Sequence, residues 1–448
     1  MTEIMERLME ASSPKEFSGC MKEAQNQFPA PADFVEAVAG YLPTRLYENY
    51  YGDSVPRGFF GIMAATEAQT ILPAETGWRP YVQQTWSAAR ERKRTPWNLD
   101  KISAQNRESL QKRWHHFTQA AESADVPASL AWAKGFLANP SDRDYFRAQG
   151  LSYALADTAH GGFKFLYLHQ AWKLAQSLQW KNLEAILFPA LHFLVAGPRE
   201  KQLSARVREY WQANPLTAAL KNSGTVSEEL RSRFEQSCLF GESTGEALDA
   251  VALLSRSGAG VDAIRDVLLM AAAQAVANSR TGHWPDPARA LNFVYLLRDW
   301  SNLVEPHRRT LALLLGAALI HQASAKSSEG GQNRDLDQLP GHLLPEDATK
   351  VLRSVVSHSD PYASATAAKV ILDRNSGNGA GLAATLMDLA VKNDGHVCGG
   401  DDILLVKAAA DCYQASLATD KNRYLVATAF FLGRIPKSYE LFGAYGFK

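Results

Sequence analysis

The sequence predicts an all-α protein, an array of internally repeated helical units that forms one elongated or compact helical body. Apolar residues recur at helical spacing along most of the chain, and almost no alternating pattern typical of β-strands is present. One aromatic pattern also returns, which is the signature of an internal repeat. Phe165, Tyr167, Leu168 and Trp172 recur in the same order as Phe293, Tyr295, Leu296 and Trp300.

Taken in order, the chain divides at composition changes and at copies of this pattern. Residues 1–125 form an N-terminal helical region with a degenerate repeat, in which Tyr81 and Trp86 repeat the tyrosine-to-tryptophan spacing. Residues 324–347 are rich in Ser, Gly, Asn, Asp and Pro, so they are predicted to be a linker or loop. The predicted helical repeats are 126–225, 226–323 and 348–448.

Composition excludes several classes of protein. The chain has 448 residues, and with 46% hydrophobic and 21% charged residues it is typical of a globular protein. Its 47 basic and 47 acidic residues cancel, which disfavours a nucleic-acid or anionic-membrane partner. The longest strongly apolar run, Leu311–Ile320, is about half of the roughly 20 residues that a membrane helix needs. The N-terminus has no secretory pattern, so we expect a soluble cytoplasmic protein.

Two further patterns have simple structural interpretations. Ser243 lies in a G-x-S-x-G sequence, the pattern of a nucleophile elbow, but no strand precedes it. Ser243 and Glu246 also match a capping box, so we predict a helix cap there. The four cysteines include no C-x-x-C pair, which argues against a disulfide framework and a thiolate zinc site.

Histidines stand at corresponding positions of the repeats. His160, His283 and His396 each lie at the junction between a loop and the helix that follows. If the repeats point these junctions toward one cleft, the imidazoles could hold iron or zinc, because metal centres in helical proteins use side chains from facing helices. The alternative is that each histidine caps a helix or packs in a turn.

His169 is predicted to face inward, because it follows Phe165 by four positions and precedes Trp172 by three. A buried imidazole must find a partner or lose stability. That partner could be a metal ion, although a backbone carbonyl would serve equally well.

The segment GFKFLYLHQAW followed by KLAQSLQWKNLEAILFPAL, together with Asp401-Asp402-Ile403-Leu404-Leu405-Val406-Lys407, resembles a known family. It looks like the helical domains of bacterial Rieske-associated proteins and, more distantly, the questin oxidase-like family, whose members include oxygenases that cleave anthraquinone rings. The resemblance spans roughly residues 130–420. The family's C-terminal motif has a histidine at the position of Leu404.

This resemblance implies a metal-dependent oxygenase-like enzyme that acts on a bulky aromatic or polyketide-like substrate. Its cofactor would be a non-haem iron or another divalent metal. The candidate ligands are His160, His169 and His283, and Lys407 would be a ligand or charge partner. The alternative function is a non-catalytic helical-repeat protein that has lost the metal site and binds a small ligand or a protein partner.

Overall fold

The structure is a computed structural model that describes residues 2–46, 57–91, 93–280, 285–327, 336, 347–374, 379–394, 398–416 and 420–446. The described residues form twenty-two α-helices and two short 3-10 helices. Their only β-type pairing is two isolated bridges. The all-α prediction is therefore confirmed.

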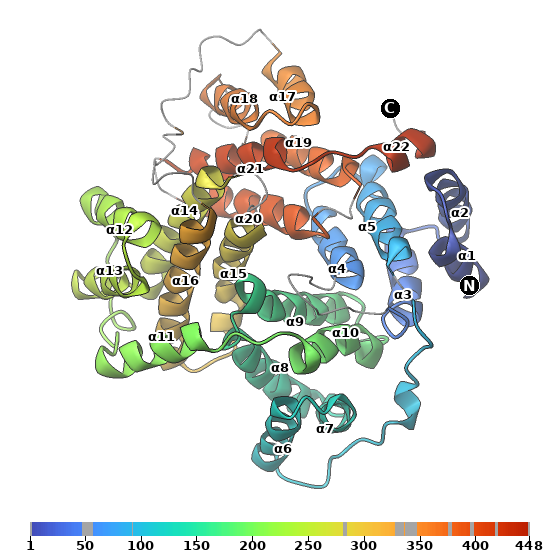
Figure 1. The fold of residues 1–448 in the computed structure, drawn as a ribbon, viewed down its shortest axis with the longest axis horizontal. Helices are drawn as coiled ribbons and strands as arrows, with labels where there is room; N and C mark the ends of the chain where they lie inside the picture. The colour runs from blue at the N-terminus through green and yellow to red at the C-terminus, as the bar shows by residue number, and fades with distance from the viewer. Residues whose placement is uncertain are drawn as a thin grey trace.

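Four helical hairpins form the centre of the molecule (Figure 1). In each hairpin two helices that follow each other in the sequence pack against each other. The pairs are α4 (Gly58–Ala68) with α5 (Arg79–Arg90), α9 (Ala159–Ser177) with α10 (Leu183–Ala196), α15 (Pro285–Ser301) with α16 (Pro306–Ser327), and α20 (Asp401–Ala415) with α21 (Asn422–Arg434).

The first helices of the hairpins, α4, α9, α15 and α20, close into a ring, and we call them the inner helices. Each packs against the next, and α20 packs back against α4 (Figure 1). Neighbouring inner helices run parallel, because residues at equivalent positions of the two helices contact each other. Phe165 and Phe293, which the sequence pairs as repeat partners, lie with their ring centroids 5.1 Å apart. The repeated aromatic residues therefore join one repeat to the next.

Most of the other helices cover the ring in four groups. Near the N-terminus α1 and α2 pack on α5, and α3 packs on α1, α2 and α10, while α6 to α8 pack on α9 and α10. Helices α11 to α14 pack on α16, and α17 to α19 pack on α21. Their bounds are α1 (Thr2–Glu10), α2 (Pro14–Gln27), α3 (Pro31–Tyr41), α6 (Leu110–Glu122), α7 (Val126–Leu137), α8 (Pro140–Leu155), α11 (Gln202–Ala213), α12 (Glu228–Phe240), α13 (Thr244–Arg256), α14 (Val261–Asn278), α17 (Ala348–Ser357), α18 (Pro361–Arg374), α19 (Gly379–Lys392) and α22 (Glu440–Tyr445).

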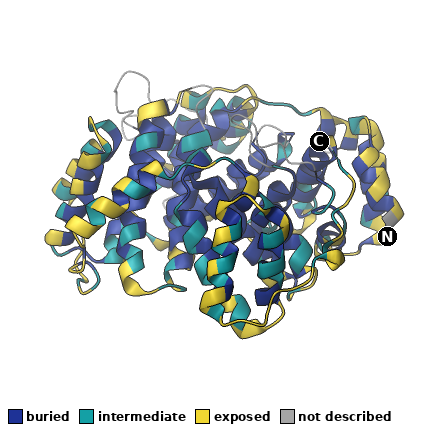
Figure 2. Cartoon of the chain, turned by 60° about the horizontal axis from the view of Figure 1, so that its bottom comes forward, coloured by how far each residue is buried: buried dark blue, intermediate teal, exposed yellow. Residues whose placement is uncertain are grey.

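Apolar burial holds the inner helices, and caps fix the ends of several outer ones. Figure 2 shows the buried residues concentrated on the central helices. The repeated tryptophans Trp172 and Trp300 are both fully buried. At the start of α13 the Ser243 hydroxyl accepts the Glu246 backbone N–H at 3.4 Å, and the Glu246 carboxylate accepts the Glu242 N–H at 3.2 Å. The predicted cap is confirmed, and this serine begins a helix without a preceding strand.

The structure also corrects one repeat alignment. Tyr81 and Trp86 lie on α5, the second helix of its hairpin, whereas the tyrosine and tryptophan of the two strong copies lie on first helices. Tyr413, which the sequence predicts to take the place of the repeated tryptophan in a weaker third copy, lies on an inner helix, α20. Helix α16 continues to Ser327, and most of the predicted linker 324–347 lies outside the described residues. The other predicted boundaries stay predictions.

Candidate functional site

The two ends of the ring differ, and we name them for what they contain. The junction end holds the first turns of the inner helices. Here Gly161 lies against Arg289, and Arg289 pairs with Asp401. Gly400, just before α20, approaches Gly61 of α4 so closely that a Cβ at position 400 would fall 3.0 Å from the Gly61 Cα. The starts of the helices that follow the three junction histidines therefore meet at one end of the ring.

His160 lies at the junction end in a strained backbone. Its φ is 53°, and Gly161 and Gly162 follow with φ of 71° and 78°, so three successive residues are left-handed. A side chain at Gly162 would fall 2.7 Å from the Phe293 ring, which explains the glycine. A non-glycine residue in this conformation is costly and persists where the surrounding structure demands it, often at functional sites. His283 and His396 lie outside the described residues.

Buried charges surround these helix starts. Arg289 reaches one Asp401 carboxylate oxygen through two of its nitrogens, each at 2.9 Å. The other oxygen, Oδ1, is buried and has no hydrogen-bond partner in the part of the chain that the structure describes. The Lys164 ammonium lies 2.7 Å from the Asp157 carboxylate, and neither side chain is more than 6% exposed. Removing one member of such a pair would leave a charge buried and unpaired, which is strongly destabilising.

Asp402 is a further buried carboxyl at this end. Burial raises its pKa to about 7, and the neighbouring Asp401 acts in the same direction, while the Ile403 backbone N–H and Lys437 oppose the shift. The first turn of a helix ordinarily favours an ionised carboxylate. For Asp402 the cost of desolvating the charge is the larger effect.

His169 lies in the middle of α9, fully buried as the sequence predicts. Burial, reinforced by Lys173 and Arg147, lowers its pKa to about 3, so the ring is neutral near neutral pH. Its contact with Asp299, 3.7 Å from Nε2 to Oδ2, is therefore not an ion pair and is too long for a hydrogen bond. Among the described residues neither ring nitrogen has a hydrogen-bond partner, and the same holds for both amide atoms of the adjacent Gln170.

Lys407 lies near the other end of the ring, where it pairs with Asp411 one turn along α20. The Tyr295 hydroxyl of α15 donates a hydrogen bond to the same carboxylate oxygen. Burial, followed by this contact, raises the pKa of the Tyr295 phenol well above its usual range, so it keeps its proton. Lys173 and Glu67, 2.5 Å apart, join α9 to α4 at the same end.

A groove opens beside this network, and we call it the α14–α20 groove. The end of the ring that carries it is called the groove end. Its outer part has a volume of about 400 Å³ and includes Arg231. Its inner chamber, of about 40 Å³, is lined by Tyr295, Asp411 and Arg298. Asp266 and Tyr424 line both parts. A chamber of this size holds a water molecule or a small polar group.

Asp266 is the titratable group best placed to meet a ligand in the groove. Its side chain is 59% exposed. The groove walls nevertheless crowd it, and this partial burial raises the pKa of the Asp266 carboxyl, while Arg265 opposes the rise. A carboxyl with a raised pKa in a concave site is suited to proton transfer.

The predicted metal ligands do not gather into one site among the residues described. His160 and His169 are nine positions apart on α9, which places them on the order of 10 Å apart along the helix. Lys407 belongs to the Asp411 network. Within the described ranges, no group of three or more His, Cys, Asp or Glu residues is placed to hold a metal ion. We therefore derive no step through a metal, and the ligand role of His283 stays a prediction.

Sequence reasoning missed most of the polar residues that the fold brings together. Asp266, Tyr295 and Asp411 come from three different helices, and Tyr295 and Asp411 are 116 positions apart. Tyr295 was visible only as a repeated aromatic residue. The polar neighbours Asp411 and Lys407, spaced by one helical turn, were the available signal of a charged helix face.

Comparison of the chain with protein-family models, with curated proteins and with solved structures finds no match. The family resemblance of the sequence stays an expectation. Among the helices described, none is both long and apolar enough to cross a membrane.

Proposed function

We propose that the chain is an enzyme that binds a bulky phenolic aromatic molecule in the α14–α20 groove and exchanges a proton with it. The single observation that carries the proposal is that Asp266, a carboxyl with a raised pKa, lines both the groove and the inner chamber. The outer volume of about 400 Å³ lies within the roughly 300–1,000 Å³ of small-molecule sites.

Each lining residue has a role in this chemistry. The Asp266 carboxylate accepts the proton of a phenol, and the Arg265 and Arg298 guanidinium groups stabilise the phenolate that forms. Tyr424 supplies an aromatic wall. These roles suit a substrate with a flat ring system and an acidic hydroxyl.

The Tyr295–Asp411–Lys407 network positions the chamber wall. Lys407 neutralises Asp411, and the Asp411 carboxylate accepts a hydrogen bond from the Tyr295 hydroxyl, which keeps its proton. The lone pairs of the Tyr295 oxygen are then directed to accept a hydrogen bond from a second hydroxyl of the substrate. Lys407 in this proposal is a positioning residue and acts through Asp411.

A dihydroxyanthraquinone dye tests the proposal, because its absorbance changes when a phenol ionises. We expect saturable binding and an apparent phenol pKa of the bound dye about one unit or more below that of the free dye. Arg298→Gln should move this pKa back toward the free value, because it removes a cation that stabilises the phenolate. Asp266→Asn should lower the pKa further, because a neighbouring carboxylate disfavours the phenolate. The control is Glu209→Gln, at an exposed carboxylate on α11 that lines neither part of the groove.

The alternative, a helical-repeat protein that binds without chemistry, predicts binding of the dye with an unchanged phenol pKa. Absence of saturable binding, or an Asp266→Asn variant with the wild-type pKa, contradicts the enzyme proposal.

A second candidate is the metal-dependent oxygenase that the resemblance implies. It draws support from one observation, that the helix starts next to His160, His283 and His396 lie at one end of the ring. It predicts stoichiometric iron, or another divalent metal, in protein produced with these metals, and loss of that metal in His160→Ala and His283→Ala. Metal-free wild-type protein, or variants that keep their metal, would exclude it.

A further inference from the structure

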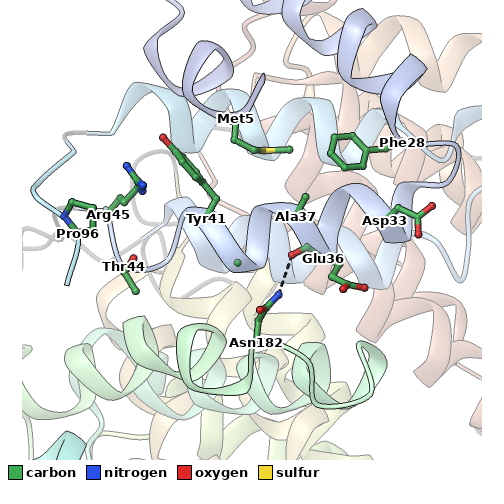
Figure 3. Close-up of a pocket in the computed structure, with 11 residues that line it drawn as sticks. Met5, Phe28, Asp33, Glu36, Ala37, Tyr41, Thr44, Arg45, Pro96 and Asn182 are labelled. Carbon is green, nitrogen blue, oxygen red and sulfur yellow. Dashed lines mark hydrogen bonds between the residues drawn. The ribbon is translucent and has the colours of Figure 1, made fainter. Parts of the chain in front are cut away.

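A second concave site lies far along the surface from the groove, between α3, α10 and the segment 96–100. It consists of two adjoining hollows of about 600 and 970 Å³, which share Gly40, Thr44, Pro96 and Asn182. We call it the α3–α10 cleft. Figure 3 shows the first hollow, with Tyr41 and Arg45 at one end and Asp33 at the other. It shares no lining residue with the α14–α20 groove.

A strained loop forms one wall of this cleft. In the connection between α9 and α10, Gln179, Trp180 and Asn182 all have positive φ, at 53°, 68° and 55°. Three such residues within four positions carry a cost in backbone strain that is typical of ligand-binding segments. The result of this loop geometry is that Trp180 and Asn182 both line the cleft. The Asn182 amide also donates to the Glu36 carbonyl oxygen at 3.3 Å, which ties the loop to α3.

Two arginines in the cleft are stacked on aromatic rings. The Arg45 guanidinium carbon lies 4.1 Å from the centroid of the Tyr41 ring. The Arg143 guanidinium carbon lies 4.6 Å from the centroid of a Trp180 ring. Stacking fixes the plane of each guanidinium and leaves its N–H edge available for hydrogen bonds.

Neither arginine has a carboxylate partner within ion-pair distance in the described part of the chain. With the residues that the structure describes, Arg143 makes one weak hydrogen bond, from Nη2 to the Leu137 carbonyl oxygen at 3.4 Å, and its buried Nε–H has no acceptor. An unpaired buried donor of a charged group is costly, and an incoming anion would satisfy it.

The charges of the remaining residues favour an anion over a cation. The lining carboxylates Glu36 and Glu184 are each paired with a lysine at 2.9 Å. Arg45 covers one face of Tyr41 and Arg143 covers one face of Trp180, which reduces the aromatic surface open to an incoming cation. Asp33 and Asp100 also line the cleft and are exposed, and Asp33 lies at the end away from Arg45 (Figure 3).

We infer that the α3–α10 cleft is a binding site for a planar aromatic anion. The acidic group lies against the N–H edge of Arg143, and the ring system packs on Trp97 and Trp180, which line the same wider hollow. Arg45, in the adjoining hollow, adds positive charge to the cleft. This site is separate from the catalytic proposal and would bind its ligand even if the groove performs no chemistry.

Two fluorescent probes with the same aromatic body test this inference. Anilinonaphthalene sulfonate carries an anionic group, and N-phenylnaphthylamine is its uncharged parent. We expect saturable binding of the sulfonate, with quenching of tryptophan fluorescence because Trp97 and Trp180 lie in the cleft. Arg143→Gln and Arg45→Gln should each weaken sulfonate binding about tenfold or more and change binding of the uncharged probe much less.

The matched control is Arg206→Gln, at an exposed position on α11. Circular dichroism of each variant shows whether the fold is intact. Equal affinity of the sulfonate for Arg143→Gln, Arg45→Gln and the control overturns the inference. Loss of sulfonate binding in Asp411→Asn with retention in both arginine variants also overturns it, because the probe would then occupy the groove.

Discussion

The two ends of the inner ring use the same types of side chain in opposite environments. At the junction end Arg289 and Asp401 are 4% and 2% exposed, so their pairing joins α15 to α20 out of contact with water. At the groove end Lys407 and Asp411 are 13% and 31% exposed, and Asp411 borders a cavity. The comparison teaches that a pair of opposite charges can join two helices at one end of the ring, while a similar pair at the other end stays accessible to a ligand.

The strongest test of this difference is Arg289→Ala, which leaves Asp401 buried and unpaired. We expect it to lower the free energy of unfolding by about 3–5 kcal/mol. Lys407→Ala at the groove end should cost no more than about 1 kcal/mol, because its partner stays partly solvated. Guanidinium denaturation followed by circular dichroism measures both. Similar losses in the two variants would show that the ends do not differ in this way.

The double variant Arg289→Ala with Asp401→Ala supplies the control. It removes both charges, so part of the stability lost in the single variant should return. A double variant less stable than Arg289→Ala would show that the pair acts through packing alone.

The next largest effect concerns pH and Asp402. Its pKa is about 7 in the folded protein and 3.8 when unperturbed, so between these values the folded state binds more protons than the unfolded state. Stability from this group is present at low pH and is lost as the pH rises through about 7, at up to about 1.4 kcal/mol per pH unit. Asp402→Asn should flatten this part of the pH profile. An unchanged profile would contradict the raised pKa.

His169 should produce a slope of the opposite sign. Its pKa is about 3 in the folded protein against 6.5 unperturbed, so the unfolded state binds more protons between these values. Stability from this group is full above about pH 6.5 and falls with acidification. His169→Leu should reduce the acid-induced loss and cost little near neutral pH, because no hydrogen bond is removed. His115→Gln, at an exposed histidine, is the control.

The smallest effect is expected at Tyr295. Tyr295→Phe removes the hydrogen bond to Asp411, which stays paired with Lys407, so stability should fall by about 1 kcal/mol. Tyr145→Phe, for a half-buried hydroxyl, serves as the comparison. A loss of several kcal/mol in Tyr295→Phe would place this network with the buried pairs of the junction end.

Local signals in the sequence predicted the helices well. Periodicity gives the helical segments, and Ser243 with Glu246 gives a cap, because each depends on residues within a few positions. The inward position of His169 followed from its spacing to Phe165. Within the described ranges neither ring nitrogen has a hydrogen-bond partner, and the expectation that this imidazole binds a partner stays a prediction. Burial follows from helical period, whereas a partner depends on a neighbouring helix.

The arrangement of the repeats could not be read in the same way. Copies of a helical pattern predict stacking, but closure depends on contacts such as Gly400 with Gly61, which join distant parts of the chain. The α14–α20 groove depends on the same closure, because it places Asp411 beside Tyr295 and Asp266. The junction histidines occupied equivalent positions in the sequence, yet their side-chain directions depend on backbone conformations such as that of His160, which no sequence period encodes.

Contact between α20 and α4 has a consequence for synthesis of the protein. In an open solenoid each new unit covers the apolar face of the last, and stability grows step by step. Here α4 finds its second neighbour only after residue 401 has been made, so the ribosome must release most of the polypeptide before its first hairpin is fully enclosed. A nascent chain of this kind depends on chaperones or on fast late assembly to avoid aggregation.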